Sequence, residues 1–175
     1  KTYNGVAFIS KKPMTDVQRG MPNFDDEQRR VITASIGDIR IINVYIPNGQ
    51  ALDSDKFQYK MHWLDALHAY VDTTMATHSG VILTGDFNIA PADIDVHDPQ
   101  EWEGKVHVSE QERAALMRLS NLGLYDSFRV MHPDEQAFSW WDYRAAGFRR
   151  NRGLRIDHLL ISDDVKRRMT DAGID

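Results

Sequence analysis

A predicted β-hairpin and a long predicted helix follow one another in the first half of the chain. Two β-rich runs, residues 30–36 and 38–46, flank Gly37-Asp38, a dipeptide typical of a tight hairpin turn. Apolar side chains then recur at helical spacing over residues 55–77, and a short apolar strand follows at residues 81–84. Strands therefore alternate with helices, and at least one strand pair is a hairpin. This order favours a mixed sheet, or two packed sheets with helices outside, over a simple parallel series.

The remaining elements are predicted from caps, turn residues and short apolar runs. Ser54 is a suitable N-cap for the long helix, and Ser109 with Glu112 forms a capping box that opens a helix through about residue 119. Residues 124–130 show no clear preference for helix or strand. Further strands are predicted at residues 6–9, 138–141 and 154–161, a short helix at 163–169, and loops at 11–28 and 89–108.

Composition places the chain among globular proteins with a real core. Its 175 residues, 42% of them hydrophobic, fit one domain spanning residues 1–175. The absence of cysteine excludes disulfides and thiolate metal sites and fits a reducing compartment. No apolar run approaches the roughly 20 residues of a membrane span, and the first ten residues lack a signal-peptide layout. We therefore expect a cytoplasmic protein with no membrane partner.

The charge of the chain is unevenly distributed. A formal net charge of -5 argues, taken alone, against electrostatic coating of nucleic acid. Five arginines nevertheless gather in one short stretch: Arg144, Arg149, Arg150, Arg152 and Arg155. Composition alone leaves two interpretations open, a solvated loop or a phosphate-contacting loop on an otherwise acidic protein.

The stretch LTGDFNIAP, residues 83–91, ends an apolar strand in a carboxylate and an amide. If the backbone stays extended, Asp86 and Asn88 point the same way and Phe87 packs on the other side. Such a pair could bind a hard divalent cation or orient a water molecule. The alternative is an Asx-turn that merely closes the strand.

Two further segments place polar groups at strand ends. In INVYIPNG, residues 42–49, Tyr45 ends a strand and Asn48 could donate its amide to a phosphate or simply form the turn. Trp140 lies just before the arginine cluster, where an aromatic face could stack on nucleic acid or could belong to the core. Asp157 lies among apolar residues, so we expect it to pair with a cation or to orient a histidine. His158 is its neighbour, but adjacent strand residues point to opposite faces.

Several other chemistries have no support in the sequence. The remaining histidines show no zinc-ligand spacing, and no nucleophile-elbow signature supports a Ser-His-Asp triad. Walker loops and Gly-x-Gly-x-x-Gly fingerprints are absent as well.

Three segments, NVYIPNG, LTGDFNIAPADIDVHDP and FSWWDYRAAGFRRNRGLRIDHLLIS, closely resemble the exonuclease III family of DNA-repair nucleases, which includes apurinic/apyrimidinic (AP) endonucleases. The resemblance runs from about Tyr3 to Asp175. It implies an α/β fold, the deoxyribonuclease I-like four-layer sandwich of two packed mixed sheets flanked by helices. It also implies 3'–5' exonuclease activity and cleavage 5' to abasic sites in double-stranded DNA, with Mg²⁺ or Mn²⁺ as cofactor, by a monomeric bacterial enzyme that works at the nucleoid.

The resemblance assigns roles to individual residues. Tyr45 would approach the scissile phosphate, Asp86 would handle a proton, Asn88 would position phosphate or water, and Asp157 would orient a catalytic histidine. Asp86 and Asn88 are also the candidate metal ligands. The candidate DNA contacts are Asn48, Trp140, Arg144 and Arg152.

Two features of the family pattern lie outside these 175 residues: a Glu that is the family's main metal ligand and a Ser-Asp-His motif that supplies the catalytic histidine. We therefore expect the sequence to be an internal segment of an active nuclease, with apolar surface and strand edges left uncovered. The alternative is a catalytically inactive DNA-binding or interaction domain of the same fold. A phosphatase of phosphoinositides or sphingomyelin is less consistent with the tryptophan-arginine segment.

Overall fold

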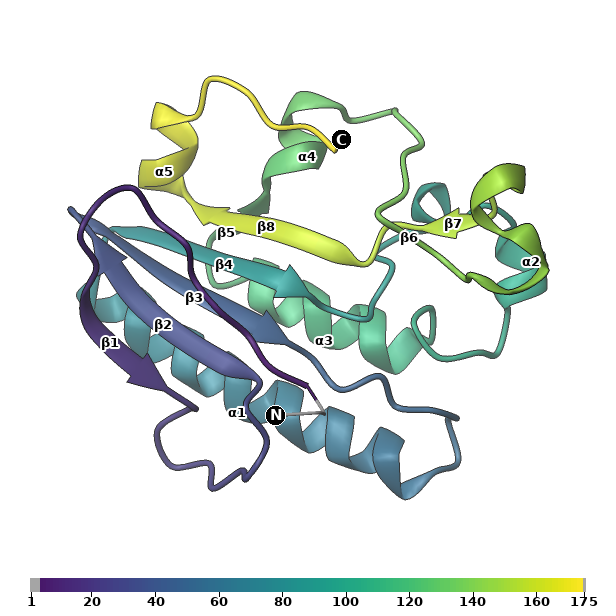
Figure 1. The fold of residues 1–175 in the computed structure, drawn as a ribbon, viewed down its shortest axis with the longest axis horizontal. Helices are drawn as coiled ribbons and strands as arrows, with labels where there is room; N and C mark the ends of the chain where they lie inside the picture. The colour runs from purple at the N-terminus through teal and green to yellow at the C-terminus, as the bar shows by residue number, and fades with distance from the viewer. Residues whose placement is uncertain (1–3, 175) are drawn as a thin grey trace.

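A six-stranded mixed sheet forms the centre of the molecule (Figure 1). The computed structural model describes residues 4–174, apart from the side chain of Ala145, so Tyr3 and Asp175 lie outside the described part. The strand order is β1-β2-β3-β4-β8-β5, and the β3–β4 pair is parallel while the other neighbours are antiparallel. These strands are β1 (Thr15–Arg19), β2 (Val31–Ile36), β3 (Ile39–Tyr45), β4 (Gly80–Asp86), β5 (Leu124–Asp126) and β8 (Asp157–Ser162). The predicted α/β class and mixed sheet are confirmed.

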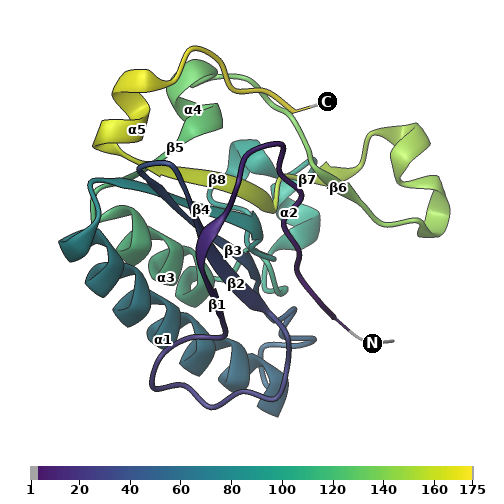
Figure 2. The same ribbon diagram turned by 60° about the vertical axis from the view of Figure 1, so that its left-hand side comes forward.

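Helices α1 (Asp55–Thr77) and α3 (Glu110–Ser120) cover one face of this sheet (Figures 1 and 2). Both begin at the predicted caps, because Ser54 accepts a hydrogen bond from the Phe57 N–H and Ser109 forms a capping box with Glu112. The shorter helices are α2 (Pro99–Trp102), α4 (Ser127–Met131) and α5 (Asp163–Arg168), with 3-10 turns at Asp93–Asp95, Arg144–Ala146 and Phe148–Arg150. Over residues 4–174, none of the helices combines the length and apolar character that a membrane crossing requires.

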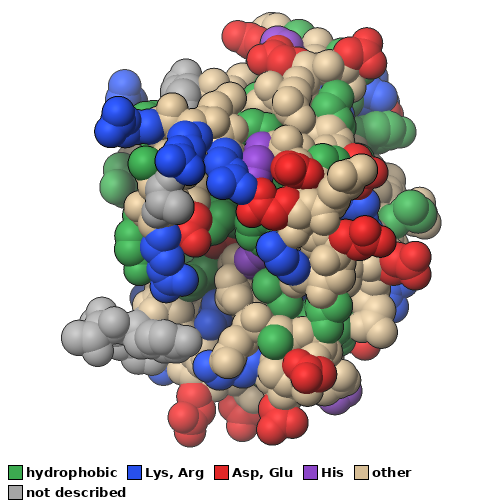
Figure 3. Space-filling model, turned by 90° about the vertical axis from the view of Figure 1, so that its right-hand side faces the viewer, with side chains coloured by type: hydrophobic (Ala, Val, Ile, Leu, Met, Phe, Trp, Pro, Cys, Tyr) green, Lys and Arg blue, Asp and Glu red, His purple; other side chains and the backbone are tan. Residues whose placement is uncertain are grey.

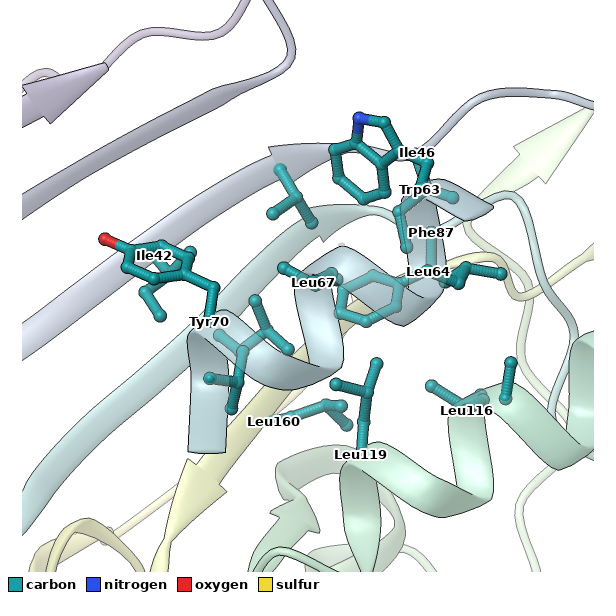
Figure 4. Close-up of a cluster of buried hydrophobic side chains, with 14 of the residues drawn as sticks. Ile42, Ile46, Trp63, Leu64, Leu67, Tyr70, Phe87, Leu116, Leu119 and Leu160 are labelled. Atoms are coloured by element: carbon teal, nitrogen blue, oxygen red, sulfur yellow. The ribbon is translucent and has the colours of Figure 1, made fainter. Parts of the chain in front are cut away.

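The main core lies between the sheet and these two helices (Figure 4). Leu64 and Leu67 from α1, Leu119 from α3, and Ile42 and Leu160 from the sheet are almost completely buried. On β3 the buried residues alternate with half-buried ones, so the strand has one face toward the helices and one face that is more open. Burial of apolar area on this scale is the main stabilising contribution to the fold.

Two N-terminal predictions are wrong. Residues 6–9 form no strand; the segment lies near β3 through one hydrogen bond from the Asn43 side chain to the Ala7 carbonyl, and Ile9 is fully exposed. A strand needs a ladder of backbone partners, which this segment lacks among the described residues. Conversely, β1 occupies part of the predicted loop 11–28. Its five residues are all exposed, so no apolar alternation marked it in the sequence.

The C-terminal half differs from the prediction in its details. The expected strand 154–161 is divided into β7 (Gly153–Leu154), which pairs with β6 (Trp140–Trp141) as a two-stranded ribbon, and β8. The strand is interrupted after Leu154, at Arg155, whose side chain is buried and paired with Asp95 and Asp126. Residues 124–130 contain both the end strand β5 and the start of α4.

Candidate active site

Tyr45, Asp86 and Asp157 lie side by side at the ends of three neighbouring strands. Tyr45 pairs with Asp86 across the parallel β3–β4 ladder, and Asp86 pairs with Asp157 across the antiparallel β4–β8 ladder. Residues in register on neighbouring strands point to the same face. This face of the sheet points away from helices α1 and α3, since the alternate residues Val44 and His158 are the buried ones.

The geometry of the β4 end depends on Gly85. Its φ of +131° is one that L-residues rarely adopt, and a Cβ there would lie 1.9 Å from the Val44 carbonyl oxygen. Beyond it, the Ile46 N–H donates to the Asp86 carbonyl and the Phe87 N–H donates to the Ile156 carbonyl, at 2.8 and 2.9 Å. A glycine is therefore required before Asp86 for steric reasons. The two hydrogen bonds connect the end of β4 to the residues that adjoin β3 and β8.

Asp86 and Asn88 are bonded to each other, but the predicted extended backbone is not what joins them. Asn88 has a φ of 51°, and its N–H donates to Asp86 Oδ1 at 2.8 Å, which is the Asx-turn that the sequence left as the alternative. The Asn88 side-chain amide also donates to Asp86 Oδ2 at 3.1 Å and to the Ile46 carbonyl at 3.0 Å. Phe87 packs into the core as predicted.

The environment of Asp86 raises the pKa of its carboxyl group above the ordinary value of 3.8. Burial, followed by the charge of Asp157, raises its pKa to about 6, while the Asn88 N–H, Lys60 and Arg30 act in the opposite direction. A carboxyl group with such a pKa is ionised at neutral pH yet can still accept and return a proton. Asp86 is therefore the best placed acid-base group of the three strand ends.

Asn48 joins this group through Asn88. Its side-chain amide donates to Asn88 Oδ1 at 3.3 Å and lies 3.4 Å from His107 Nε2. Asn88 is only 4% exposed and all its amide hydrogens are used, whereas Asn48 is exposed. Asn48 is thus the member of the pair that faces solvent, and Asn88 orients it together with Asp86.

Tyr45 is held from behind by Arg30. The Arg30 guanidinium lies 4.7 Å from the centre of the Tyr45 ring and donates from Nη1 to the Tyr45 carbonyl at 3.0 Å. A cation over an aromatic ring stabilises both groups by the attraction of the charge to the ring face. These two contacts hold the strand end that carries the phenol against Arg30.

Asp157 is less enclosed than the sequence suggested. It was expected to be a buried carboxylate paired with a cation or histidine, but its residue is exposed, and among the described residues no ion pair involves it. Its backbone N–H donates to Ser139 Oγ at 3.0 Å, and partial burial raises its pKa. His158 lies on the opposite face as predicted, donating from Nε2 to the Ile89 carbonyl at 2.7 Å.

Two cavities adjoin these residues. One of about 350 Å³ is lined by Asp86 and Asp157, with Ser139 beside them. Another of about 590 Å³ is lined by Asn48, Trp140 and His107, and the Trp140 and His107 rings lie 6.4 Å apart. Asp86 and Asp157 therefore line one hollow and Asn48 and Trp140 line another, while Tyr45 lines neither of the two.

The arginine cluster separates into two kinds of side chain. Arg155 is 1% exposed and paired with Asp95 and Asp126, so the interpretation of this residue as a phosphate contact is wrong. Arg152 is paired with Glu101 and donates to His97. Arg144, Arg149 and Arg150 are exposed. On the side of the molecule that carries this loop, Lys and Arg side chains lie among acidic ones rather than on a uniformly basic face (Figure 3).

Sequence reasoning missed a buried ion pair beneath the site, Lys60 with Glu112. Both side chains are fully buried, and Lys60 Nζ donates to the Asn88 and Asn48 carbonyls at 2.8 and 3.2 Å. A signal was present, because Lys60 falls at helical spacing between Phe57 and Leu64 on the apolar face of α1.

The donor set at the strand ends suits a hard cation. Two neighbouring carboxylates, Asp86 and Asp157, raise the energy of each other's ionised form, and a divalent cation would relieve that repulsion with oxygen ligands. No cluster of three or more His, Asp or Glu side chains able to hold a metal occurs within residues 4–174. Within the described residues, Asp86 and Asn88 therefore remain candidate ligands without such a cluster around them.

The chain is similar to known nucleases over nearly its whole length. The model of the Endonuclease/Exonuclease/phosphatase family matches residues 1–175. An exodeoxyribonuclease of Bacillus subtilis is 37% identical over 176 residues, which cover 99% of this chain and 69% of that protein.

Solved structures of similar proteins share the fold. One is a 3' phosphatase, NExo, from Neisseria bound to a product DNA hairpin, with 49% identity, a TM-score of 0.87, and coverage of 89% of this chain and 61% of that one. Another is an AP endonuclease from Archaeoglobus fulgidus, with 35% identity, a TM-score of 0.87, and coverage of 91% and 63%. The chain therefore spans a little under two thirds of these solved relatives.

Proposed function

Because the chain belongs to the Endonuclease/Exonuclease/phosphatase family, we propose that the protein hydrolyses phosphodiester bonds of double-stranded DNA in DNA repair. The proposed reactions are 3'–5' exonuclease cleavage and incision 5' to an abasic site. The observation that carries the proposal is the register of Tyr45, Asp86 and Asp157 across three strand ends on one face. A monomeric, cytoplasmic enzyme with one catalytic domain is part of the proposal.

The proposed chemistry divides the work among these side chains. Water attacks phosphorus, the bond to the leaving oxygen breaks, and Asp86 takes the proton of the water or returns one to the leaving oxygen. Tyr45 donates its phenol hydrogen to a phosphate oxygen as negative charge develops there. Asn88 orients Asp86 through the 2.8 Å N–H bond, and Asn48 donates to phosphate.

Asp157 is proposed to orient a histidine that acts on the reacting phosphate. His158 cannot be that residue, because it is buried on the opposite face and both of its ring nitrogens are engaged, Nε2 with the Ile89 carbonyl and Nδ1 with Arg155. Mg²⁺ or Mn²⁺ would be held by Asp86 and the Asn88 amide oxygen, and would supply charge neutralisation when bound. Trp140 is proposed to flank the pocket for a base-less sugar, with Arg144 and Arg152 near the DNA backbone.

The experiment is a nicking and degradation assay with the full-length protein. The substrates are an abasic duplex and a duplex with a recessed 3' end, each with Mg²⁺ and with EDTA. Metal-dependent cleavage supports the proposal. Binding of duplex DNA without any cleavage would instead favour an inactive DNA-binding domain of the same fold.

A second candidate activity is removal of a 3'-terminal phosphate from DNA. It is favoured by the 49% identity to a protein described as a 3' phosphatase. The same groups would act, because a phosphomonoester differs only in the group that remains on phosphorus. A 3'-phosphorylated hairpin in the assay separates this activity from exonuclease cleavage by the appearance of inorganic phosphate without release of nucleotides.

A further inference from the structure

Lys60 and Glu112 form a buried ion pair that connects the helix layer to the site loops. Lys60 lies on α1 and Glu112 on the first turn of α3, and both side chains are 0% exposed. Burying two charges is costly unless their hydrogen-bonding capacity is used completely. The cost of burying this pair therefore depends on the other hydrogen bonds that Lys60 and Glu112 make.

Every hydrogen of the Lys60 ammonium has an acceptor. One bonds Glu112 Oε1, one bonds the Asn88 carbonyl at 2.8 Å, and one bonds the Asn48 carbonyl at 3.2 Å. The two carbonyls belong to loops that follow β3 and β4, forty residues apart in the chain. One cation thus fixes the separation of the two loops that carry the amide couple.

Glu112 uses both of its carboxylate oxygens to hold the loop before α3. Its Oε1 accepts from the His107 N–H at 3.0 Å, and its Oε2 accepts from the Ser109 N–H and Oγ at 3.2 and 2.6 Å. His107 in turn donates from Nδ1 to the same Asn88 carbonyl at 2.7 Å. A single carbonyl oxygen, that of Asn88, is held by both Lys60 and His107.

This convergence has a backbone reason. Asn88 adopts a φ of 51°, a left-handed conformation that is uncommon for non-glycine residues although asparagine adopts it more readily than most. With its carbonyl held from below, the Asn88 N–H and side chain point toward Asp86 and Asn48. We infer that the Lys60–Glu112 pair is a positioning device of the proposed nuclease, which sets the Asn48–Asn88 couple against Asp86 without touching substrate.

The inference rests on the proposed function and is tested in the full-length protein by separating stability from turnover. Lys60→Met alone leaves Glu112 buried and unpaired and should lower the Tm. The double variant Lys60→Met/Glu112→Gln removes both charges and should recover much of the Tm. It still lacks the donors to the two carbonyls, so kcat should remain ~10-fold or more below that of the parent, with KM for DNA nearly unchanged.

A matched control is the exposed ion pair between the same helices, Arg118 with Asp65, whose Nη2 and Oδ1 lie 2.5 Å apart. Arg118→Met/Asp65→Asn should leave kcat at the parent value. A Lys60→Met/Glu112→Gln protein with both parent Tm and parent kcat would overturn the inference.

A second readout does not depend on activity. In metal-free protein without DNA, the side-chain amide resonances of Asn48 and Asn88 should shift in the double variant and stay in place in the control. If the double variant does not fold, Ser109→Ala, which removes one hydrogen bond to Glu112, takes its place and should cause smaller shifts in the same direction. Unmoved resonances in a folded variant would overturn the inference even if the protein proved to have no nuclease activity.

Discussion

Asp86 and Asp157 face each other across the antiparallel β4–β8 ladder, and the charge of Asp157 adds to burial in raising the pKa of Asp86 to about 6. Two carboxylates placed together in this way destabilise each other when both are ionised. Such an arrangement costs folding stability at neutral pH. It is therefore expected where a cation or a proton is to be exchanged.

Asp86→Asn removes the carboxyl group that exchanges the proton in the proposed reaction. Loss of the acid-base group should lower turnover on DNA by more than about a hundredfold while the protein remains folded. Initial rates under saturating Mg²⁺ and far-UV circular dichroism check the two parts. Activity within a few fold of the parent would contradict the role of Asp86.

The same variant should be more stable than the parent without metal. The folded-state pKa of Asp86 lies above its ordinary value of 3.8, so its contribution to stability is present at low pH and is lost as pH rises to about 6. The Asn variant does not titrate, so its advantage should grow from pH 4 to 6 and then level off, after a gain of about 3 kcal/mol. Urea denaturation in EDTA across this range measures it, and a pH-independent difference would be the contrary result.

His158 predicts an opposite pH dependence. Burial, followed by the charge of Arg155, lowers its pKa to about 4 from 6.5. The unfolded chain therefore takes up this proton first, so stability is full above pH 6.5 and falls as pH drops toward 4, by about 3 kcal/mol. The measurement is denaturation in an Asp86→Asn background, with His158→Asn as the comparison. A comparison variant that loses as much stability over this range would exclude His158 as the cause.

The sequence indicated which strand ends carry polar side chains, and backbone rules explain why two of these ends meet. Strand ends recognisable from LTGDFN and NVYIPNG converge because β3 and β4 are parallel neighbours, which follows from the helix between them. Lys60 and Arg155 could not be assigned in the same way, because their partners Glu112 and Asp95 are 52 and 60 residues distant. Edge strand β1 was not predicted because all its side chains are exposed and no apolar periodicity marks it in the sequence.

Trp140→Ala should affect substrate handling more than metal binding. Trp140 lines the 590 Å³ cavity with Asn48, away from the paired carboxylates of β4 and β8. Cleavage of an abasic duplex should fall, while the Mg²⁺ concentration that gives half-maximal rate on ordinary duplex should stay within about threefold of the parent, since no metal-ligand oxygen is lost. Equal losses in both measurements would argue against a substrate-pocket role.

The arginines of the β6–β7 loop differ in whether they have an acidic partner. Arg149 and Arg150 are exposed, and no acidic partner is described for either within residues 4–174, whereas Arg152 is paired with Glu101. If the free pair contacts phosphate, Arg149→Ala/Arg150→Ala should weaken binding of any DNA duplex. It should also reduce the slope of log K against log salt by up to about 1.8, since each lost phosphate contact contributes about 0.9.

Arg152→Ala should change this slope less, because Glu101 already neutralises its charge locally. The control Arg19→Ala/Lys56→Ala removes two exposed positive charges elsewhere, on β1 and α1, for which no acidic partner is described within residues 4–174. Fluorescence anisotropy at several salt concentrations gives all the slopes with one labelled duplex. Equal slopes for the Arg149/Arg150 variant and this control would mean that net charge, not the β6–β7 loop, governs attraction to DNA.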